Sequence, residues 1–275
     1  MKTEKFFGMV VLFILTFAHV NAQKKMNPEI LKSLPQSLEL KDEVQKYQVV
    51  TNHINGDIFG NFFNKMQVKG NYTRGLAGGK VKWNKVSVAT SMQPEGDYPE
   101  GEKLNYMEDF SYVPSEEMIQ PEKFEHFTGM YTAFAQNLVW DILGIEGLAW
   151  AHFEKLELNK PFHATDFNGE LDLAGQGTFE NKNMLLTWTG ISEMNGELCA
   201  LIDFRTFRNP LEYRAEETKL KGLSHYWGTI WVSLSDKQIE HATLLEIVSA
   251  EMQFPGQTGK QVMSITREIE VKKLL

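Results

Sequence analysis

Two weak groups of histidines and carboxylates are the first candidates for chemistry in this chain. His152 and Glu154 are two residues apart, so on a strand they would share one side, and His163 and Asp166 follow nearby. Imidazole nitrogens and carboxylate oxygens bind zinc and related metals, but this spacing matches no diagnostic metal motif. The sequence therefore favours ordinary surface or capping roles, and it predicts no metal site and no cofactor.

A third histidine, His225, begins the segment His225-Tyr226-Trp227 and could supply a general base, but a buried, hydrogen-bonded histidine is the favoured interpretation. No standard catalytic signature accompanies it. The chain has no Gly-x-Ser-x-Gly, no His-Glu-x-x-His, no phosphate-binding glycine loop and no dinucleotide fingerprint. Catalytic groups can be scattered through a sequence, so a hydrolase with a dispersed site around these three histidines remains a hypothesis. No individual catalytic residue is predicted.

The aromatic residues give a stronger indication of a site. Trp227 and Trp231 are four residues apart on a predicted strand and therefore share a side, while Ile230 and Val232 occupy the other side. Such a strand is either covered on both sides or lines a cavity on one of them, and ligand pockets are commonly lined by aromatic side chains with a few polar groups. The predicted ligand-binding residues are Trp188, Tyr226, Trp227, Trp231 and Arg267.

Arg267 interrupts the apolar face of the last predicted strand, between Ile265 and Ile269. A buried guanidinium requires a carboxylate partner. Glu246 and Glu251 of the preceding strand are candidates, and structural pairing with one of them is the favoured interpretation. The alternative is that Arg267 binds an acidic group of a ligand.

These side chains must be positioned by strands, because most of the chain from Gln45 onward alternates or is rich in β-branched and aromatic residues. Asn55-Gly56, Asn168-Gly169 and Asn195-Gly196 are hairpin signals. Short connections between neighbouring strands imply antiparallel pairing, and we count about nine or ten strands. The alternation in residues 80–89 changes phase near Asn84-Lys85, which predicts a bulge or a twist there.

One convincing helix is predicted, over about residues 129–145. Its apolar residues recur every three or four positions and lie on one face, whereas Asp141 lies away from that face. These apolar residues are Tyr131, Phe134, Ala135, Leu138, Val139, Ile142 and Ile145. The predicted fold is mainly β (α+β), a large curved antiparallel sheet or half-open barrel with this amphipathic helix packed on its concave face.

The amino terminus has the layout of a cleaved signal peptide over residues 1–22. Lys2 and Lys5 precede an apolar run, and the segment ends in Val20-Asn21-Ala22. The run is about 15 residues long, shorter than the roughly 20 that span a bilayer, so a retained anchor is the less favoured alternative. A polar lead-in over residues 23–42 and a single domain over residues 43–275 would follow.

Composition narrows the function further. The net charge is −8 and there is no basic stripe, which argues against nucleic-acid binding. No later segment is long and apolar enough for a stable membrane span. Cys199 is the only cysteine, so the chain has no internal disulfide and no lipid-anchor cysteine at the cleavage site. We therefore expect a secreted or periplasmic protein.

Three hypotheses follow from these observations. The leading one is a non-enzymatic binding protein that holds an apolar or amphiphilic small molecule between the sheet and the helix. The second is an envelope interaction or scaffold protein with a solid core. The third is the hydrolase with a dispersed site.

Overall fold

The computed structural model describes residues 38–41, 43–215, 218–253 and 259–275. The predicted signal peptide lies outside these residues, as does all of the predicted lead-in except residues 38–41. Everything that follows concerns the described part of the chain.

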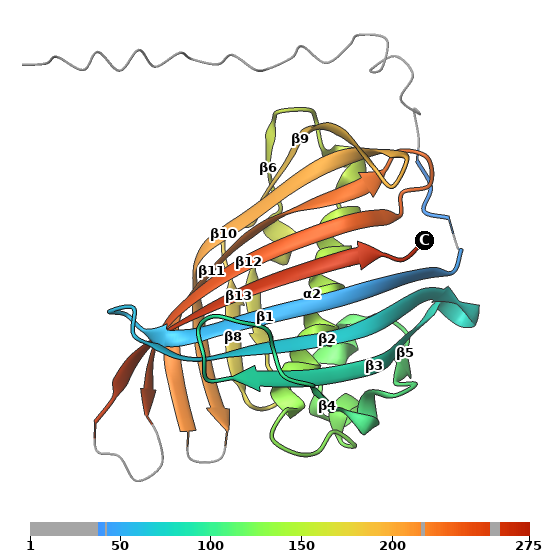
Figure 1. Cartoon of the computed structure of the whole chain (residues 1–275). Coiled ribbons are helices and arrows are strands. Elements are labelled where there is room, and N and C mark those ends of the chain that lie inside the picture. Colours follow the sequence, from blue (N-terminus) through green and yellow to red (C-terminus); the bar gives the residue numbers. More distant parts are fainter. Residues whose placement is uncertain (1–37, 42, 216–217, 254–258) are drawn as a thin grey trace, which may run out of the picture. The chain divides into compact units, whose positions relative to one another are not determined.

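A single antiparallel sheet of 13 strands dominates the structure and does not close into a barrel, which confirms the predicted fold class (Figure 1). The strands are β1 (Gln45–Asp57), β2 (Phe62–Leu76), β3 (Lys80–Ser91), β4 (Glu102–Lys103), β5 (Ser111–Tyr112), β6 (Pro161–His163), β7 (Gly169–Asp172), β8 (Gly177–Asn181), β9 (Leu185–Met194), β10 (Glu197–Ala215), β11 (Thr218–Ser233), β12 (Ile239–Gln253) and β13 (Gln261–Lys273).

The main path through the sheet is β4-β3-β2-β1-β13-β12-β11-β10-β8-β7, with β5 paired to β3, β9 to β10, and β6 to β9. Pairing of β1 with β13 therefore brings the two ends of the described chain together in the middle of the sheet. The observed strands outnumber the nine or ten that we predicted, because several of the additional ones are only two or three residues long.

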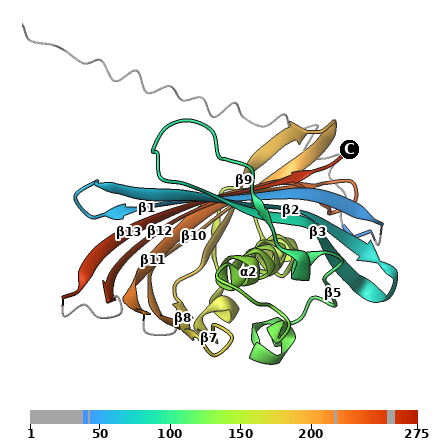
Figure 2. The same ribbon diagram turned by 60° about the horizontal axis from the view of Figure 1, so that its bottom comes forward.

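The main helix is α2 (Thr132–Trp150), which lies across one face of the sheet (Figure 2). It begins three residues later and ends five residues later than predicted, because neither Gly144 nor Gly147 ends it. Short 3-10 turns occur at Ala77–Gly79, Asn105–Met107, Glu116–Ile119, Pro121–Phe124, Phe153–Lys155 and Thr165–Phe167.

Only one of the three Asn-Gly pairs forms the predicted hairpin turn. Asn195 and Gly196 form the predicted two-residue turn between β9 and β10, with φ angles of 54° and 81°. Gly56, by contrast, lies inside β1, and the β1–β2 turn follows Asp57, whose carboxylate accepts hydrogen bonds from the backbone of Phe59 and Asn61 at 2.8 and 2.9 Å. Gly169 begins β7 instead of forming a hairpin turn.

The predicted irregularity near Asn84-Lys85 is confirmed. The register between β2 and β3 shifts there, since Lys69 pairs with Ser87 but Asn71 pairs with Asn84, and Lys85 takes a φ of 54°. This β-bulge turns both Val81 and Val86 into the core, although they fall on opposite phases of the alternation.

The helix-facing side of the sheet forms the main hydrophobic core. Leu138, Val139 and Ile142 of α2 pack with sheet residues such as Val49 and Ile230, and all five are at most 2% exposed. The cavity that remains here has a volume of about 10 Å³ and is lined by Tyr47, Tyr72, Ile142, Ile145, Glu146, Ile239 and Val271. A volume of this size holds about one water molecule. The space between helix and sheet is therefore filled.

A buried ion cluster connects α2 to the middle of the sheet. The Arg267 guanidinium on β13 pairs with Glu246 on β12, as predicted, and also with Asp141 of α2. We expected Asp141 away from the packed face, but its side chain is only 13% exposed because Arg267 draws it toward the sheet. Burial raises the pKa of Asp141 even though Arg267 lowers it. Glu251, the other predicted partner, pairs with Lys260 at 2.6 Å.

A second buried contact fixes the other half of α2. The Glu146 carboxylate accepts a hydrogen bond from the Tyr72 hydroxyl at 2.9 Å and lies 3.2 Å from Nε of Arg74. The Arg74 guanidinium also lies over the Trp150 ring, 4.2 Å from its centre. With the Arg267 cluster, this contact sets both the position and the rotation of the helix, so that the opposite face of the sheet is left without a helix.

The close approach of β11 and β12 gives a first prediction, for Gly228. A Cβ atom at Gly228 would lie 1.9 Å from the Thr243 carbonyl oxygen and 2.6 Å from Cζ of Phe204. We expect Gly228→Ala to lower the free energy of unfolding by about 1–3 kcal/mol or more, measured by urea denaturation. Gly190→Ala is the control, because nothing lies within 4 Å of that position, and it should change stability by less than about 0.5 kcal/mol. Equal effects would contradict the packing.

A second prediction concerns His53, which is 4% exposed and packs edge-on against Phe134 of α2. Burial, and then the charge of Arg267, lowers the pKa of His53 from 6.5 to about 3. The unfolded chain therefore binds a proton at His53 below about pH 6.5 that the folded protein does not. The stabilisation from neutral His53 is complete above pH 6.5 and is lost as the pH falls toward 3.

The measurement is urea denaturation of the native protein and of His53→Phe at several pH values. Between pH 6.5 and 4.5 the native protein should lose about 1 kcal/mol per pH unit more than the variant, which has nothing to protonate at this position. Parallel pH profiles would show that His53 is not held neutral by the fold.

Candidate ligand-binding site

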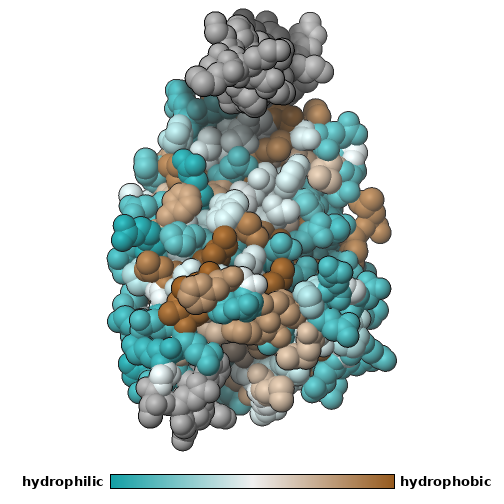
Figure 3. Space-filling view, turned by 60° about the vertical axis from the view of Figure 1, so that its left-hand side comes forward, coloured by the Kyte–Doolittle hydropathy of each residue, from teal (hydrophilic) through white to brown (hydrophobic). Residues whose placement is uncertain are grey.

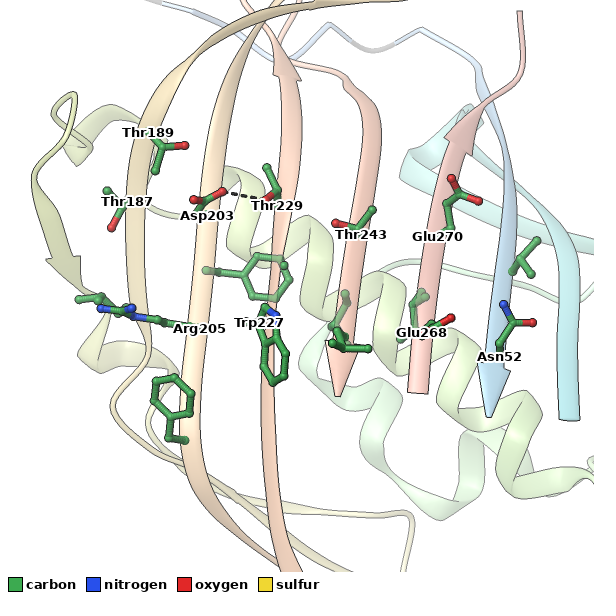
Figure 4. A pocket seen from close by; sticks show the side chains of 18 residues that line it. Asn52, Thr187, Thr189, Asp203, Arg205, Trp227, Thr229, Thr243, Glu268 and Glu270 are labelled. Carbon is green, nitrogen blue, oxygen red and sulfur yellow. Dashed lines mark hydrogen bonds between the residues drawn. The ribbon is translucent and has the colours of Figure 1, made fainter. Parts of the chain in front are cut away.

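A groove of about 1010 Å³ lies on the face of the sheet that α2 does not cover. Figure 4 looks onto this face, with the labelled side chains in front of the strands and the helix behind them. The groove crosses β9, β10, β11, β12, β13 and β1. It is lined by Val50, Asn52, Leu185, Thr187, Thr189, Asp203, Phe204, Arg205, Phe207, Trp227, Gly228, Thr229, Thr243, Leu244, Leu245, Glu268, Ile269 and Glu270.

Strand alternation explains which side chains reach the groove. Along β11, Tyr226 and Ile230 contact the helix-side core, so Trp227 and Thr229 point to the opposite face. The long central strands therefore carry a closed core on one side and the groove on the other.

Two segments rise from the sheet on the same side as the groove. Figure 2 shows the connection between β3 and β4 curving over β1 and β2 on the side away from α2, and the β9 region rising beyond them. Lys65 on β2 holds this connection, donating to the carbonyl oxygens of Pro94 at 3.2 Å and Gly96 at 2.6 Å, with Tyr98 against its ammonium group. The connection borders the groove at its β1 end.

The groove surface is mainly apolar at its centre. Trp227 is 36% exposed and Phe207 is 49% exposed. Leu245 lies beside the indole on β12, and Leu185 lies two strands away on β9, beyond Arg205 of β10. Figure 3 shows apolar side chains gathered on this side of the molecule within a hydrophilic surround. Apolar side chains with a few polar groups are the usual lining of a small-molecule site.

Polar side chains surround this centre. The Thr229 hydroxyl donates to Asp203 at 2.7 Å, and Asn52 accepts from the Gln67 amide at 3.1 Å. Glu270 lies 2.9 Å from Lys272 and 3.2 Å from His241, and its pKa is lowered although burial opposes this. These groups offer hydrogen-bonding positions around an apolar floor.

The structure separates the five predicted ligand-binding residues. Only Trp227 lines the groove. Trp231 shares its side of β11 but packs edge-on against His241, with ring centres 4.9 Å apart.

The other three predicted residues lie on the helix side of the sheet. Trp188 and Tyr226 lie against the helix-side core, where the Trp188 indole donates to the Gly190 carbonyl and the Tyr226 hydroxyl donates to Asn181. Arg267 is held in the buried ion cluster and does not face the groove.

Several residues that line the groove were not predicted as site residues, namely Arg205, Phe207, Leu245 and Glu268. Alternation in the sequence placed Arg205 on the side opposite Phe204, which is a signal for its direction. Nothing in the sequence showed that Leu245 would lie beside Trp227, because that depends on the register between two strands.

The histidine groups do not form a metal site within the described residues. His152 is buried under Phe162 and Phe167, and its Nε2 atom lies 3.7 Å from Asp166. His225 stacks near Phe207 on the edge of the groove, and its Nδ1 accepts from the backbone of Arg208 at 3.3 Å. His152 and His225 thus pack against phenylalanine side chains.

The described residues contain no helix that is long and apolar enough to cross a membrane.

Comparisons with known proteins give little further guidance. No protein-family model matches the chain, and no curated protein matches it either. Among solved structures, one of lipovitellin, concerned with lipid–protein interactions in that protein, is similar with a TM-score of 0.41 and 12% sequence identity. The match covers 84% of this chain and 25% of the lipovitellin chain, so the chain spans about a quarter of that protein's length. A likeness this distant assigns no family and no function.

Proposed function

We propose that this chain is an exported, non-enzymatic binding protein that holds an apolar or amphiphilic small molecule in the groove on the helix-free face of the sheet. The observation that carries the proposal is the groove itself, about 1010 Å³ of space with the partly exposed Trp227 at its centre. Ligand sites commonly measure roughly 300–1,000 Å³, so the groove is large enough for an acyl chain or a ring system.

The proposed location differs from the one that we expected from the sequence. A ligand between helix and sheet would need space there, but the cavity on that side measures only about 10 Å³. Opening it would require breaking the contacts of Asp141 and Glu146 with the sheet. The helix-free face offers the volume without any such change.

Export is the second part of the proposal and rests on the amino-terminal sequence pattern, which lies outside the described residues. In any aqueous compartment, an apolar molecule gains free energy when a protein surface shields it from water. The groove supplies such a surface.

An envelope interaction or scaffold role is the second candidate. It is favoured by Ile58 and Phe59 in the β1–β2 turn, which are 52% and 85% exposed, together with the filled core. Exposed apolar side chains of this kind mark contact sites for other proteins when they form a patch. Native mass spectrometry separates the two candidates, because a binding protein should carry a small molecule and a scaffold should carry another chain.

The hydrolase hypothesis receives no specific support. Among the described residues, none of His152, His163 and His225 hydrogen-bonds both a carboxylate and a hydroxyl or thiol. Burial raises the pKa of Cys199 to about 12, so its thiol stays protonated at neutral pH.

Truncation of Trp227 tests the proposed site. We expect Trp227→Ala to weaken binding of dodecanoate about tenfold or more in isothermal titration calorimetry, because removing a central aromatic contact costs about 2 kcal/mol. Tyr226→Phe is the matched control, since the neighbouring side chain lies on the helix side of the same strand. Its affinity should equal that of the native protein.

The proposal would be contradicted if Trp227→Ala bound dodecanoate as tightly as the native protein. It would also be contradicted if Tyr226→Phe caused the larger loss, because the ligand would then lie on the helix side. Urea denaturation of both variants establishes that each is folded at the titration temperature.

A further inference from the structure

Four side chains form a straight row across the floor of the groove. Arg205 on β10 pairs in register with Trp227 on β11, Trp227 with Leu245 on β12, and Leu245 with Glu268 on β13. Residues directly opposite one another on neighbouring strands point to the same face of the sheet. Across the sheet, the row therefore consists of a cation (Arg205), an indole (Trp227), an aliphatic side chain (Leu245) and an anion (Glu268).

The two charged ends of this row are exposed and have no ionic partner among the described residues. Neither Arg205 nor Glu268 makes a salt bridge there. The other acids of the groove differ in this respect, since Asp203 accepts from Thr229 at 2.7 Å and Glu270 lies beside Lys272 and His241. Arg205 and Glu268 are thus the charges that remain available to a ligand.

The distance between these two charges sets the length of a matching ligand. Three strand spacings of about 4.8 Å place the Cα atoms of Arg205 and Glu268 about 14 Å apart. In Figure 4 the Arg205 side chain extends from β10 toward β9, and Glu268 stands at the opposite side of the groove. An occupant that touches both must be extended, and its middle must lie over Trp227 and Leu245.

The surrounding charges give the occupant a direction. At the β13 end, the Glu268 carboxylate has no salt-bridge partner among the described residues, whereas Glu270 is paired with Lys272 and the ammonium of Lys65 is held by the carbonyl oxygens of the β3–β4 connection. A cationic group is therefore favoured beside Glu268 and an anionic group beside the guanidinium of Arg205, which lines the β10 end.

We propose that the groove selects a linear zwitterion with an apolar middle, its anionic end at Arg205, its chain across Trp227 and Leu245, and its cationic end at Glu268. This inference rests on the proposed function, because it names the class of molecule that the same groove takes. The inference adds charge recognition to the fit of size and shape, since an apolar groove without the two end charges would accept any amphiphile of suitable size.

Three probes of equal chain length test the proposal by calorimetric titration of the full-length protein at neutral pH. They are 12-aminododecanoic acid, which carries both charges, dodecanoic acid, which carries only the anion, and dodecylamine, which carries only the cation. We expect 12-aminododecanoic acid to bind about three- to fivefold more tightly than either of the others, the gain expected for one exposed ion pair. High salt should reduce this preference.

Two charge-neutral variants then assign each end. Arg205→Gln should remove the advantage of the zwitterion over dodecylamine, and Glu268→Gln should remove its advantage over dodecanoic acid. Glu170→Gln, an exposed glutamate of β7 at the far edge of the sheet, is the control and should leave all three affinities unchanged.

The outcomes separate the inference from the proposed function. If all three probes bind with equal affinity and neither variant changes this, the groove binds amphiphiles without distinguishing their charged ends. The inference is then overturned while the proposed function stands. If none of the probes binds, the proposed function itself is overturned. A zwitterion preference that survives both variants would place its charges elsewhere and would also overturn the inference.

Discussion

A buried guanidinium at the centre of the sheet fixes the position of α2 and thereby determines which face of the sheet stays uncovered. Arg267 is held between Glu246 on the neighbouring strand and Asp141 on α2, so the helix cannot slide or roll without leaving a charge unpaired in the core. Breaking such a pair by removing one partner costs about 3–5 kcal/mol. Glu146, Tyr72 and Arg74 repeat the arrangement further along the helix.

This constraint makes the two faces of the sheet structurally different. The helix side is filled, with a remaining cavity of about 10 Å³. The other side bears the groove of about 1010 Å³, where Trp227, Leu245 and Phe207 contact solvent. A ligand in the proposed groove would enter and leave without disturbing the core between helix and sheet.

Much of the fold follows from local patterns in the sequence, but the site does not. Alternation predicted the strands and placed Trp227 opposite Ile230, and the short connections predicted antiparallel pairing. The apolar spacing located the helix to within a few residues. The register between strands is a tertiary property, so the row from Arg205 to Glu268 had no local signal.

Two predictions were wrong for a similar reason. Asp141 was predicted to lie away from the packed face of the helix, because its partner Arg267 is 126 residues away in the sequence. The turn at Asp57 replaced the one expected at Gly56 because side-chain hydrogen bonds stabilise it.

Photo-cross-linking with a diazirine analogue of dodecanoic acid tests most directly on which face a ligand binds. After illumination and proteolysis, mass spectrometry identifies the labelled residues. If the ligand occupies the helix-free face, label will appear on groove residues of β10 to β13 such as Trp227 and Leu245, and Trp227→Ala will reduce it. Label concentrated on Leu138 or Ile142 of α2 would show that the ligand lies beneath the helix and would contradict the account.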